Sequence, residues 1–291
     1  MITVNDVVPT DADINEYRER GYWITPKLLQ DEQINQLRRE VTRIFEYDYD
    51  RDIYPFDRVY SYDLKSPELR KVNNGWWLND NIRSIVLSPE LGALVAPLME
   101  TNEVRIWHDQ VVLKPGVGPE GANYSGANIG WHQDYAHWQV ASSQKMCTLW
   151  LALQDTDLNN GGMRTIAGSQ KWGLVPNSDS FHDKDLETLK QKYAGIHEWV
   201  DEPCILKAGC ASIHDCLCFH GSGPNLSHDP RLSIIIHYMP GGTYYRGRID
   251  PFAKIQPGRK GNRHANVPLL GPNAKPGDLF AGECFPKVWP A

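Results

Sequence analysis

The chain has 291 residues and a net charge of −6, and 41% of its residues are hydrophobic. This composition is sufficient for a large buried core, while 24 glycines and 20 prolines predict many turns. The scattered lysines and arginines argue against a broad nucleic-acid surface, and the lack of any run of 18 apolar residues argues against a membrane helix.

Helices are predicted in the first hundred residues and once more further along the chain. Residues 31–46 carry apolar side chains at helical spacing, with Asp31 as the expected N-cap. Residues 11–20 form a second helix, and the apolar stretch 89–100 forms a third. One further helix is expected at about 184–194, where it interrupts a series of strands.

From residue 104 onward the pattern changes to short β-rich segments bounded by Gly, Pro, Asn or Asp. Helices followed by many antiparallel strands predict a mainly β protein with a jelly-roll core, the double-stranded β-helix. We expect a single domain over residues 1–291, with helical support at about 10–100, the core at about 103–240, and a C-terminal loop or lid over 241–291. The predicted strands are 104–114, 146–154, 162–167, 203–207 and 231–239.

The N-terminal residues 1–14 are acidic and lack the basic start and apolar centre of a signal peptide. The six cysteines show no C-x-x-C spacing, so neither a zinc knuckle nor a disulfide framework is predicted. We therefore expect a cytoplasmic protein without a membrane or nucleic-acid partner, either a monomer or a homodimer. The basic stretch 246–264 is either a solvated surface or a loop that holds an anionic substrate.

The segment GWHQDYAHWQV, residues 130–140, carries His132 and Asp134 two positions apart. Residues i and i+2 of an extended strand point to the same side, so both side chains can reach one metal ion. Further along, His220 ends an apolar run in CLCFHGSGPNLSHDPR, and Arg231 follows it by eleven positions. In an antiparallel hairpin this spacing brings the two residues to the same cavity from adjacent strands.

Two histidines and one carboxylate form the ligand set of non-haem Fe(II) oxygenases, which leaves three coordination positions open. A 2-oxo acid fills two of these positions and dioxygen fills the third. The distal carboxylate of 2-oxoglutarate then needs a buried cation, and the fork of Arg231 matches both of its oxygens. Alternative third ligands are available, but none has both a following turn and a suitably placed arginine. These alternatives are His214, His228 and His237.

The motifs resemble the phytanoyl-CoA dioxygenase family of Fe(II)/2-oxoglutarate oxygenases, which also includes ectoine hydroxylase and several natural-product oxygenases. The resemblance covers about residues 12–240 and implies a jelly-roll fold and a need for Fe(II), 2-oxoglutarate and dioxygen. Five elements stand in the order of the family: RERGYWITPKLL, VVLKPG, WHQDY, LWLALQDTDLNNGGMRTIAGSQKWG and FHGSGPNLSHDPR.

Residue by residue, the resemblance implies a catalytic iron centre and a co-substrate pocket. His132, Asp134 and His220 would bind the iron. Arg231 would bind the distal carboxylate of 2-oxoglutarate, and the hydroxyl of Ser222 would contact the same group.

The resemblance also implies roles for five residues of the co-substrate and substrate pockets. Gln110 and Trp150 would contact 2-oxoglutarate, although Trp150 is equally interpreted as a core residue of a strand. Tyr135 and Trp138 would line the substrate pocket, with structural packing as the alternative for each, and His108 is a weaker candidate for the same pocket.

The expected function is the oxidation, most often hydroxylation, of a small-molecule metabolite, for example in secondary metabolism, with release of succinate and CO2. Desaturation, cyclisation and endoperoxide formation use the same chemistry and stay open. Halogenation is disfavoured because Asp134 stands where related halogenases have Gly or Ala. Two other classes also stay open: a non-catalytic jelly-roll binding protein, and a zinc-dependent hydrolase that uses the same three ligands without a role for Arg231.

Overall fold

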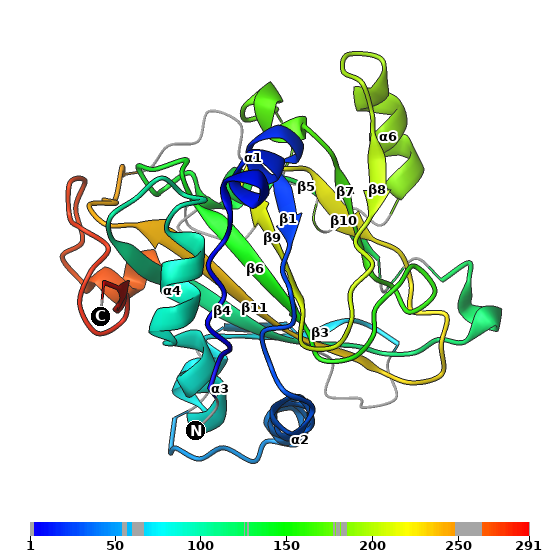
Figure 1. The fold of residues 1–291 in the computed structure, drawn as a ribbon, viewed down its shortest axis with the longest axis horizontal. Coiled ribbons are helices and arrows are strands. Elements are labelled where there is room, and N and C mark those ends of the chain that lie inside the picture. Colours follow the sequence, from blue (N-terminus) through cyan, green and yellow to red (C-terminus); the bar gives the residue numbers. More distant parts are fainter. Residues whose placement is uncertain are drawn as a thin grey trace.

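The computed structural model describes residues 3–53, 57–59, 67–124, 126, 128–176, 178, 181, 185–247 and 264–290. Within these residues the strands form two antiparallel sheets, one of eight strands and one of four (Figure 1). The large sheet has the order β1-β9-β6-β11-β4-β3-β2, with β12 also paired to β4, and the small sheet has the order β5-β10-β7-β8. The prediction of a mainly β jelly-roll fold with flanking helices is therefore confirmed.

The large sheet is built around two long strands, β4 and β11, which pair along almost their whole length. Its strands are β1 (Tyr22–Ile24), β2 (Asp57–Val59), β3 (Arg70–Asn73), β4 (Val104–Lys114), β6 (Cys147–Ala152), β9 (Ala211–Asp215), β11 (Arg231–Pro240) and β12 (Lys287–Trp289). The small sheet has much shorter strands, which are β5 (Ile129–His132), β7 (Met163–Ile166), β8 (Asp201–Pro203) and β10 (His220–Ser222).

One face of the large sheet packs against helices to form the main hydrophobic core. Ile234 and Ile236 of β11 and Leu149 of β6 point to this face and are fully buried. Because side chains alternate along a strand, their neighbours point to the opposite face. The helices are α1 (Asp11–Arg20), α2 (Asp31–Phe45), α3 (Asp80–Val86), α4 (Pro89–Val95), α5 (Asp134–Trp138) and α6 (Leu186–Ala194).

The opposite face of the large sheet, here called the inner face, carries most of the polar side chains of the sheet. Cross-strand neighbours on this face are fixed by the register: His237 of β11 lies opposite both His108 of β4 and Thr148 of β6. At the other end of the same strands, Arg231 lies opposite Lys114. The inner face therefore has an imidazole-rich end and a cationic end.

Several predicted elements are confirmed and others are wrong. The helices expected at 11–20, 31–46 and 184–194 are α1, α2 and α6, but the N-cap of α2 is Gln30 rather than Asp31. The helix at 89–100 is shorter than expected, because α4 ends at Val95. The strand predicted at 203–207 is wrong in position, since β8 covers Asp201–Pro203.

The C-terminal segment was expected to be a loop or lid throughout. Instead, its last described residues form β12, which pairs with β4 and continues the large sheet. Phe280 and Phe285 of the same segment pack against Trp107 of β4. Most of the basic stretch 246–264 lies outside the described residues. Among those described, none of the helices has both the length and the apolar character needed to cross a membrane.

Candidate active site

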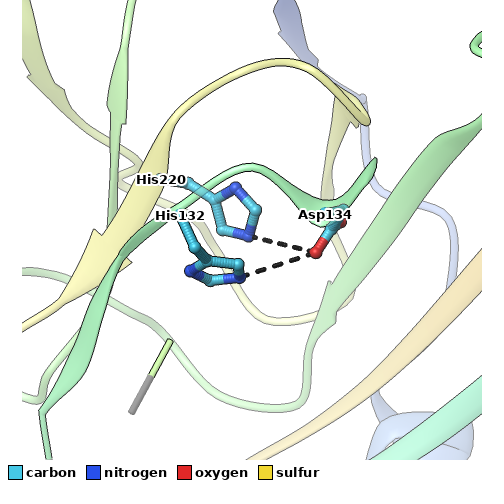
Figure 2. A group of neighbouring side chains, drawn as sticks. All are labelled: His132, Asp134 and His220. Atoms are coloured by element: carbon cyan, nitrogen blue, oxygen red, sulfur yellow. Dashed lines mark ion pairs between the residues drawn. The ribbon is translucent and has the colours of Figure 1, made fainter. Parts of the chain in front are cut away.

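Three side chains from two distant parts of the sequence converge at one point (Figure 2). His132 is the last residue of β5, and His220 is the first residue of β10. Asp134 begins α5. Its Oδ1 lies 3.5 Å from His132 Nε2 and 3.7 Å from His220 Nε2. All three residues are buried, and their ligand atoms lie within 4.8 Å of one another.

The register of the small sheet places the two imidazoles together. His220 pairs directly with His132 across β10 and β5, and the ring centroids are 4.1 Å apart. His132 Nδ1 lies 2.8 Å from the carbonyl oxygen of Gly130, and His220 Nδ1 lies 3.0 Å from that of Cys218. Since a carbonyl only accepts, each Nδ1 carries the proton and donates it. Each Nε2 therefore presents a lone pair, as a metal ligand must.

The electrostatics of the group favour a neutral His220 beside an ionised Asp134. Burial, followed by the neighbouring His132 and His214, lowers the pKa of His220 well below its usual range. Burial alone would raise the pKa of Asp134, but the surrounding imidazoles, His220 first, hold it well below its usual range. The carboxylate is thus ionised in the folded protein, which is the state that binds a cation.

Two geometric expectations about these residues are wrong. His132 and Asp134 do not share one strand, because β5 ends at His132 and Asp134 is already helical. His220 and Arg231 do not lie on adjacent strands of a hairpin, because β10 belongs to the small sheet and β11 to the large one. The two histidine ligands and Arg231 therefore come from different sheets, and Asp134 comes from α5.

The second oxygen of Asp134 is held on the side away from the two histidine ligands. Thr148 donates a hydrogen bond of 2.6 Å to Asp134 Oδ2, and His214 Nε2 lies 3.4 Å from the same oxygen. The Thr148 hydroxyl also lies 2.8 Å from His237 Nδ1. Of the alternative third ligands, His214 and His237 thus lie behind Asp134, whereas His228 is exposed. This leaves Oδ1 as the oxygen that faces the histidines.

The cationic end of the inner face contains Arg231 and, beside it, Trp150, two of the four residues predicted for the co-substrate. The Arg231 guanidinium lies 4.9 Å from the centre of the Trp150 ring, and its Nη1 is 3.4 Å from Ser233 Oγ. Its Nε is buried without a hydrogen-bond partner among the described residues. Burial lowers the pKa of Arg231 to about 10, which still leaves it charged at neutral pH.

Lys114 was missed by the sequence reasoning. It is fully buried, and its ammonium group donates to Ser222 Oγ at 2.7 Å and to the carbonyl of Gly223. Alternate residues of a strand share one face, and Lys114 follows Gln110 by four positions on the same strand. Continuing the pattern that groups His108 with Gln110 would therefore have placed Lys114 on the same face. A second cation therefore lies beside the predicted co-substrate hydroxyl.

The imidazole-rich end of the inner face adjoins the metal group. The His237 ring lies 4.5 Å from the His108 ring and 4.8 Å from the Trp138 ring, measured between centroids. Gln110 Nε2 is 3.5 Å from His108 Nε2. Tyr135 donates its hydroxyl to the carbonyl of Ala141, and Tyr135 and Trp138 belong to the same buried hydrophobic cluster. Trp138 also contacts His108 and His237 of the inner face, so it lies between that cluster and the imidazole-rich end.

Phe181 is another residue that the sequence reasoning did not single out. Its ring lies 5.0 Å from the His132 ring in an edge-to-face arrangement, and the Lys71 ammonium lies 4.7 Å from its centre. Phe181 lies in the segment between β7 and β8, where no motif of the sequence marks it. The side chain contributes apolar surface beside the metal group.

A family model describes most of this chain. The phytanoyl-CoA dioxygenase model matches residues 17–233, which include all three candidate metal ligands and Arg231. The chain belongs to the phytanoyl-CoA dioxygenase family. It is accordingly an Fe(II)- and 2-oxoglutarate-dependent dioxygenase, so the family, the enzyme class and the cofactors predicted from the sequence are confirmed.

Individual relatives are more distant. An ectoine dioxygenase of Streptomyces avermitilis is 23% identical over 257 residues, which cover 84% of this chain and 82% of the relative. A probable alpha-ketoglutarate-dependent hypophosphite dioxygenase of Stutzerimonas stutzeri is 27% identical, and the match covers 77% of this chain and 76% of the relative. The crystal structure of the carbocyclase SnoK from nogalamycin biosynthesis matches with a TM-score of 0.71 at 20% identity, covering 96% of both chains. This last likeness shows the shared fold.

Proposed function

We propose that this protein oxidises a small-molecule metabolite, most simply by hydroxylation, while converting 2-oxoglutarate to succinate and CO2. The observation that carries the proposal is the pair of sites on the inside of the fold. A His-Asp-His group with converging lone pairs lies near one end, and a buried Arg231 with an unpartnered Nε lies at the other end of the inner face. A buried charge of this kind calls for an anionic partner.

The residues fit an Fe(II) ion. His132, Asp134 and His220 supply two neutral nitrogen donors and one carboxylate oxygen, which is the facial set of Fe(II) oxygenases. Hydrogen bonds fix the outer atoms of all three: carbonyl oxygens accept from the two Nδ1 atoms, and Thr148 donates to Asp134 Oδ2. Such outer contacts orient metal ligands before the ion binds.

The residues also fit 2-oxoglutarate. Arg231 supplies a forked cation, and Trp150 lies against its guanidinium. Since Lys114 donates to the Ser222 oxygen, the Ser222 hydroxyl hydrogen is free to point toward a carboxylate. Arg231, Lys114 and Ser222 would thus hold the distal carboxylate, with charge-assisted hydrogen bonds as the main source of affinity.

When bound, iron and co-substrate supply the oxidant that is formed from dioxygen and removes hydrogen from the substrate. The chain itself orients and encloses the reactants. Asp134 keeps Oδ1 toward the metal group because Thr148 occupies Oδ2. Trp138 and Phe181 contribute apolar surface that keeps water away from the reacting centre.

Succinate formation tests this proposal. Protein loaded with Fe(II) and supplied with 2-oxoglutarate, dioxygen and a metabolite extract is expected to form succinate and to produce mass-spectrometric features that gain oxygen or lose hydrogen. Asp134→Ala is expected to abolish succinate formation, whereas Asp155→Ala, a matched change of an exposed carboxylate, is expected to preserve it.

Two outcomes would contradict the proposal. Turnover of a substrate with zinc that is indifferent to Arg231→Ala would indicate a hydrolase. Tight binding of small molecules without any oxygen consumption would indicate a binding protein. Both measurements use the same preparations as the succinate assay.

The proposal includes a cytoplasmic location and a monomeric or homodimeric state. Its support is that all six cysteines are free thiols, as is typical of a reducing compartment. The relatives named after ectoine and hypophosphite act, by their names, on small polar molecules, which supports a substrate of similar size. Purification from fractionated cells, followed by light scattering, tests both points.

A further inference from the structure

His237 belongs to the imidazole-rich end of the inner face and is linked to the metal group through Thr148. It lies on β11, opposite Thr148 on one neighbouring strand and His108 on the other. Only 4% of its surface is exposed. It is not a member of the metal group, and the function proposed above gives it no role. Its two ring nitrogens nevertheless have different and well-defined surroundings.

The direction of the hydrogen bonds around Thr148 fixes the tautomer of His237. The Thr148 hydroxyl donates its one hydrogen to Asp134 Oδ2 at 2.6 Å. That hydroxyl has no second hydrogen to offer, so at the 2.8 Å contact with His237 it accepts. His237 therefore carries its proton on Nδ1 and donates it to Thr148. The chain of donors runs from His237 through Thr148 to Asp134.

The other ring nitrogen is consequently an acceptor. Burial lowers the pKa of His237 to about 3, so the ring is neutral and Nε2 holds a lone pair. Nε2 is buried and has no hydrogen-bond partner within the part of the chain that the structure describes. The rings of Trp138 and His108 pack against the same imidazole. A buried acceptor without a donor is costly, and such atoms call for a bound partner.

We propose that His237 has two roles: its Nδ1 positions Asp134 through Thr148, and its Nε2 accepts a hydrogen bond from an O–H or N–H group of the substrate. The inference rests on the proposed function, because it assigns the substrate of that same site to the class of small molecules that carry a hydroxyl, amine or amide hydrogen. A site built to accept such a bond discriminates strongly against an analogue without the donor, since the buried acceptor then stays unpaired.

The two roles can be separated by a matched pair of variants. The amide nitrogen of asparagine lies close to the position of Nδ1, so His237→Asn can keep the donation to Thr148 while it removes the acceptor at Nε2. The amide of glutamine lies close to the position of Nε2, so His237→Gln can keep an acceptor there while it removes the donation to Thr148. Thr148→Ser and Thr148→Val form a second pair that keeps or removes the hydroxyl.

The first readout is the affinity for Co(II), measured by equilibrium dialysis in the presence of 2-oxoglutarate. His237→Asn and Thr148→Ser are expected to bind the metal as the wild type does. His237→Gln and Thr148→Val are expected to bind it roughly 10- to 100-fold more weakly, as is typical when an outer contact of a metal ligand is lost. Equal affinity in all five proteins, each shown to unfold cooperatively, would overturn the Nδ1 role.

The second readout is the binding of two probes of nearly equal size to the Zn(II) protein with 2-oxoglutarate, measured by calorimetry. Cyclohexanol has a hydroxyl donor and cyclohexanone has none. The wild type and His237→Gln are expected to bind cyclohexanol about tenfold or more tightly than cyclohexanone, and His237→Asn is expected to lose the preference. His228→Asn, the same change at an exposed histidine, should behave as the wild type.

Equal binding of the two probes to the wild type, binding of neither, or a preference that persists in His237→Asn would overturn the Nε2 role. Neither readout requires turnover, so a failure of the inference is distinguishable from a failure of the proposed function. If the proposed function is wrong, the wild type will form no succinate, and this result does not depend on what the variants of His237 bind.

Discussion

The two sheets of this protein contribute different parts of one site. The large sheet has strands of up to 11 residues and packs its outer face into the main core, whereas the small sheet has strands of three or four residues. Both histidines of the metal group lie on the small sheet, while Arg231 and Lys114 lie on the large one. The two histidine ligands are therefore held by short ladders and local contacts, and Arg231 and Lys114 by an extended ladder.

Substitution of one buried isoleucine in each sheet gives the comparison with the largest expected effect on the free energy of unfolding. Ile234 lies in the main core of the large sheet, and Ile166 lies in a small cluster beside β10, where its amide nitrogen bonds the carbonyl of Phe219. Ile234→Ala is expected to lower the free energy of unfolding by about 2–5 kcal/mol, toward the upper end of that range. Ile166→Ala should fall toward the lower end and, unlike Ile234→Ala, weaken metal binding, because Phe219 precedes His220.

Denaturant unfolding and metal dialysis on both variants measure this difference. If Ile234→Ala weakened metal binding as much as Ile166→Ala did, the two sheets would not be separable in function. If both variants left metal binding unchanged, the local cluster would have no influence on the small sheet's ligands.

A buried carboxyl of the large sheet, that of Asp109, is expected to make the free energy of unfolding depend on pH. Burial raises the pKa of Asp109 to about 7, above the value of 3.8 of an exposed carboxyl. Between these two values the folded state binds the proton and the unfolded state does not, so the unfolding free energy falls as pH rises through this window. A shift of about 3 units corresponds to roughly 4 kcal/mol.

Asp109→Asn removes this contribution, because an amide does not titrate. The difference in unfolding free energy between the wild type and Asp109→Asn is expected to change by up to about 4 kcal/mol between pH 4 and 8, and to be constant above pH 8. Urea unfolding at a series of pH values measures it. A difference that does not depend on pH would show that Asp109 is ionised in the folded protein throughout.

Arginines on the two sheets provide the third comparison. Arg231 is buried on the large sheet, whereas Arg164 of the small sheet is partly exposed and paired with Asp201. Arg231→Leu is expected to raise the KM for 2-oxoglutarate roughly 10- to 100-fold, as the loss of charged hydrogen bonds of about 1.5–3 kcal/mol requires. Arg164→Leu should leave that KM unchanged. An unchanged KM in Arg231→Leu would place the distal carboxylate elsewhere.

Sequence reasoning predicted the parts of the fold that have a strong local pattern. The strand predicted at 104–114 coincides with β4. Its β-branched and alternating residues are of the kind that packs well in a buried sheet, so the local pattern was sufficient. The shorter strands β2, β3, β9 and β12 were missed, since three to five residues carry too little periodicity to distinguish a strand from a turn. Their pairing depends on contacts with distant strands.

The candidate site shows the same division. His132, Asp134, His220 and Arg231 were identified from spacing and family motifs, and the structure brings the three metal ligands together. Their arrangement was predicted wrongly, because spacing alone does not reveal that β10 and β11 belong to different sheets. The link from His237 to Asp134 through Thr148 had no sequence signal, since it joins three separate segments through single hydrogen bonds.

The central claim is that His132, Asp134 and His220 hold one Fe(II) ion at which 2-oxoglutarate binds. Anaerobic titration of the iron-loaded protein with 2-oxoglutarate, followed by visible absorption, tests it most directly. The wild type is expected to develop a weak charge-transfer band that saturates with one equivalent of the co-substrate, and His220→Ala is expected to show none. Absence of the band in the wild type, or its full retention in His220→Ala, would contradict the account.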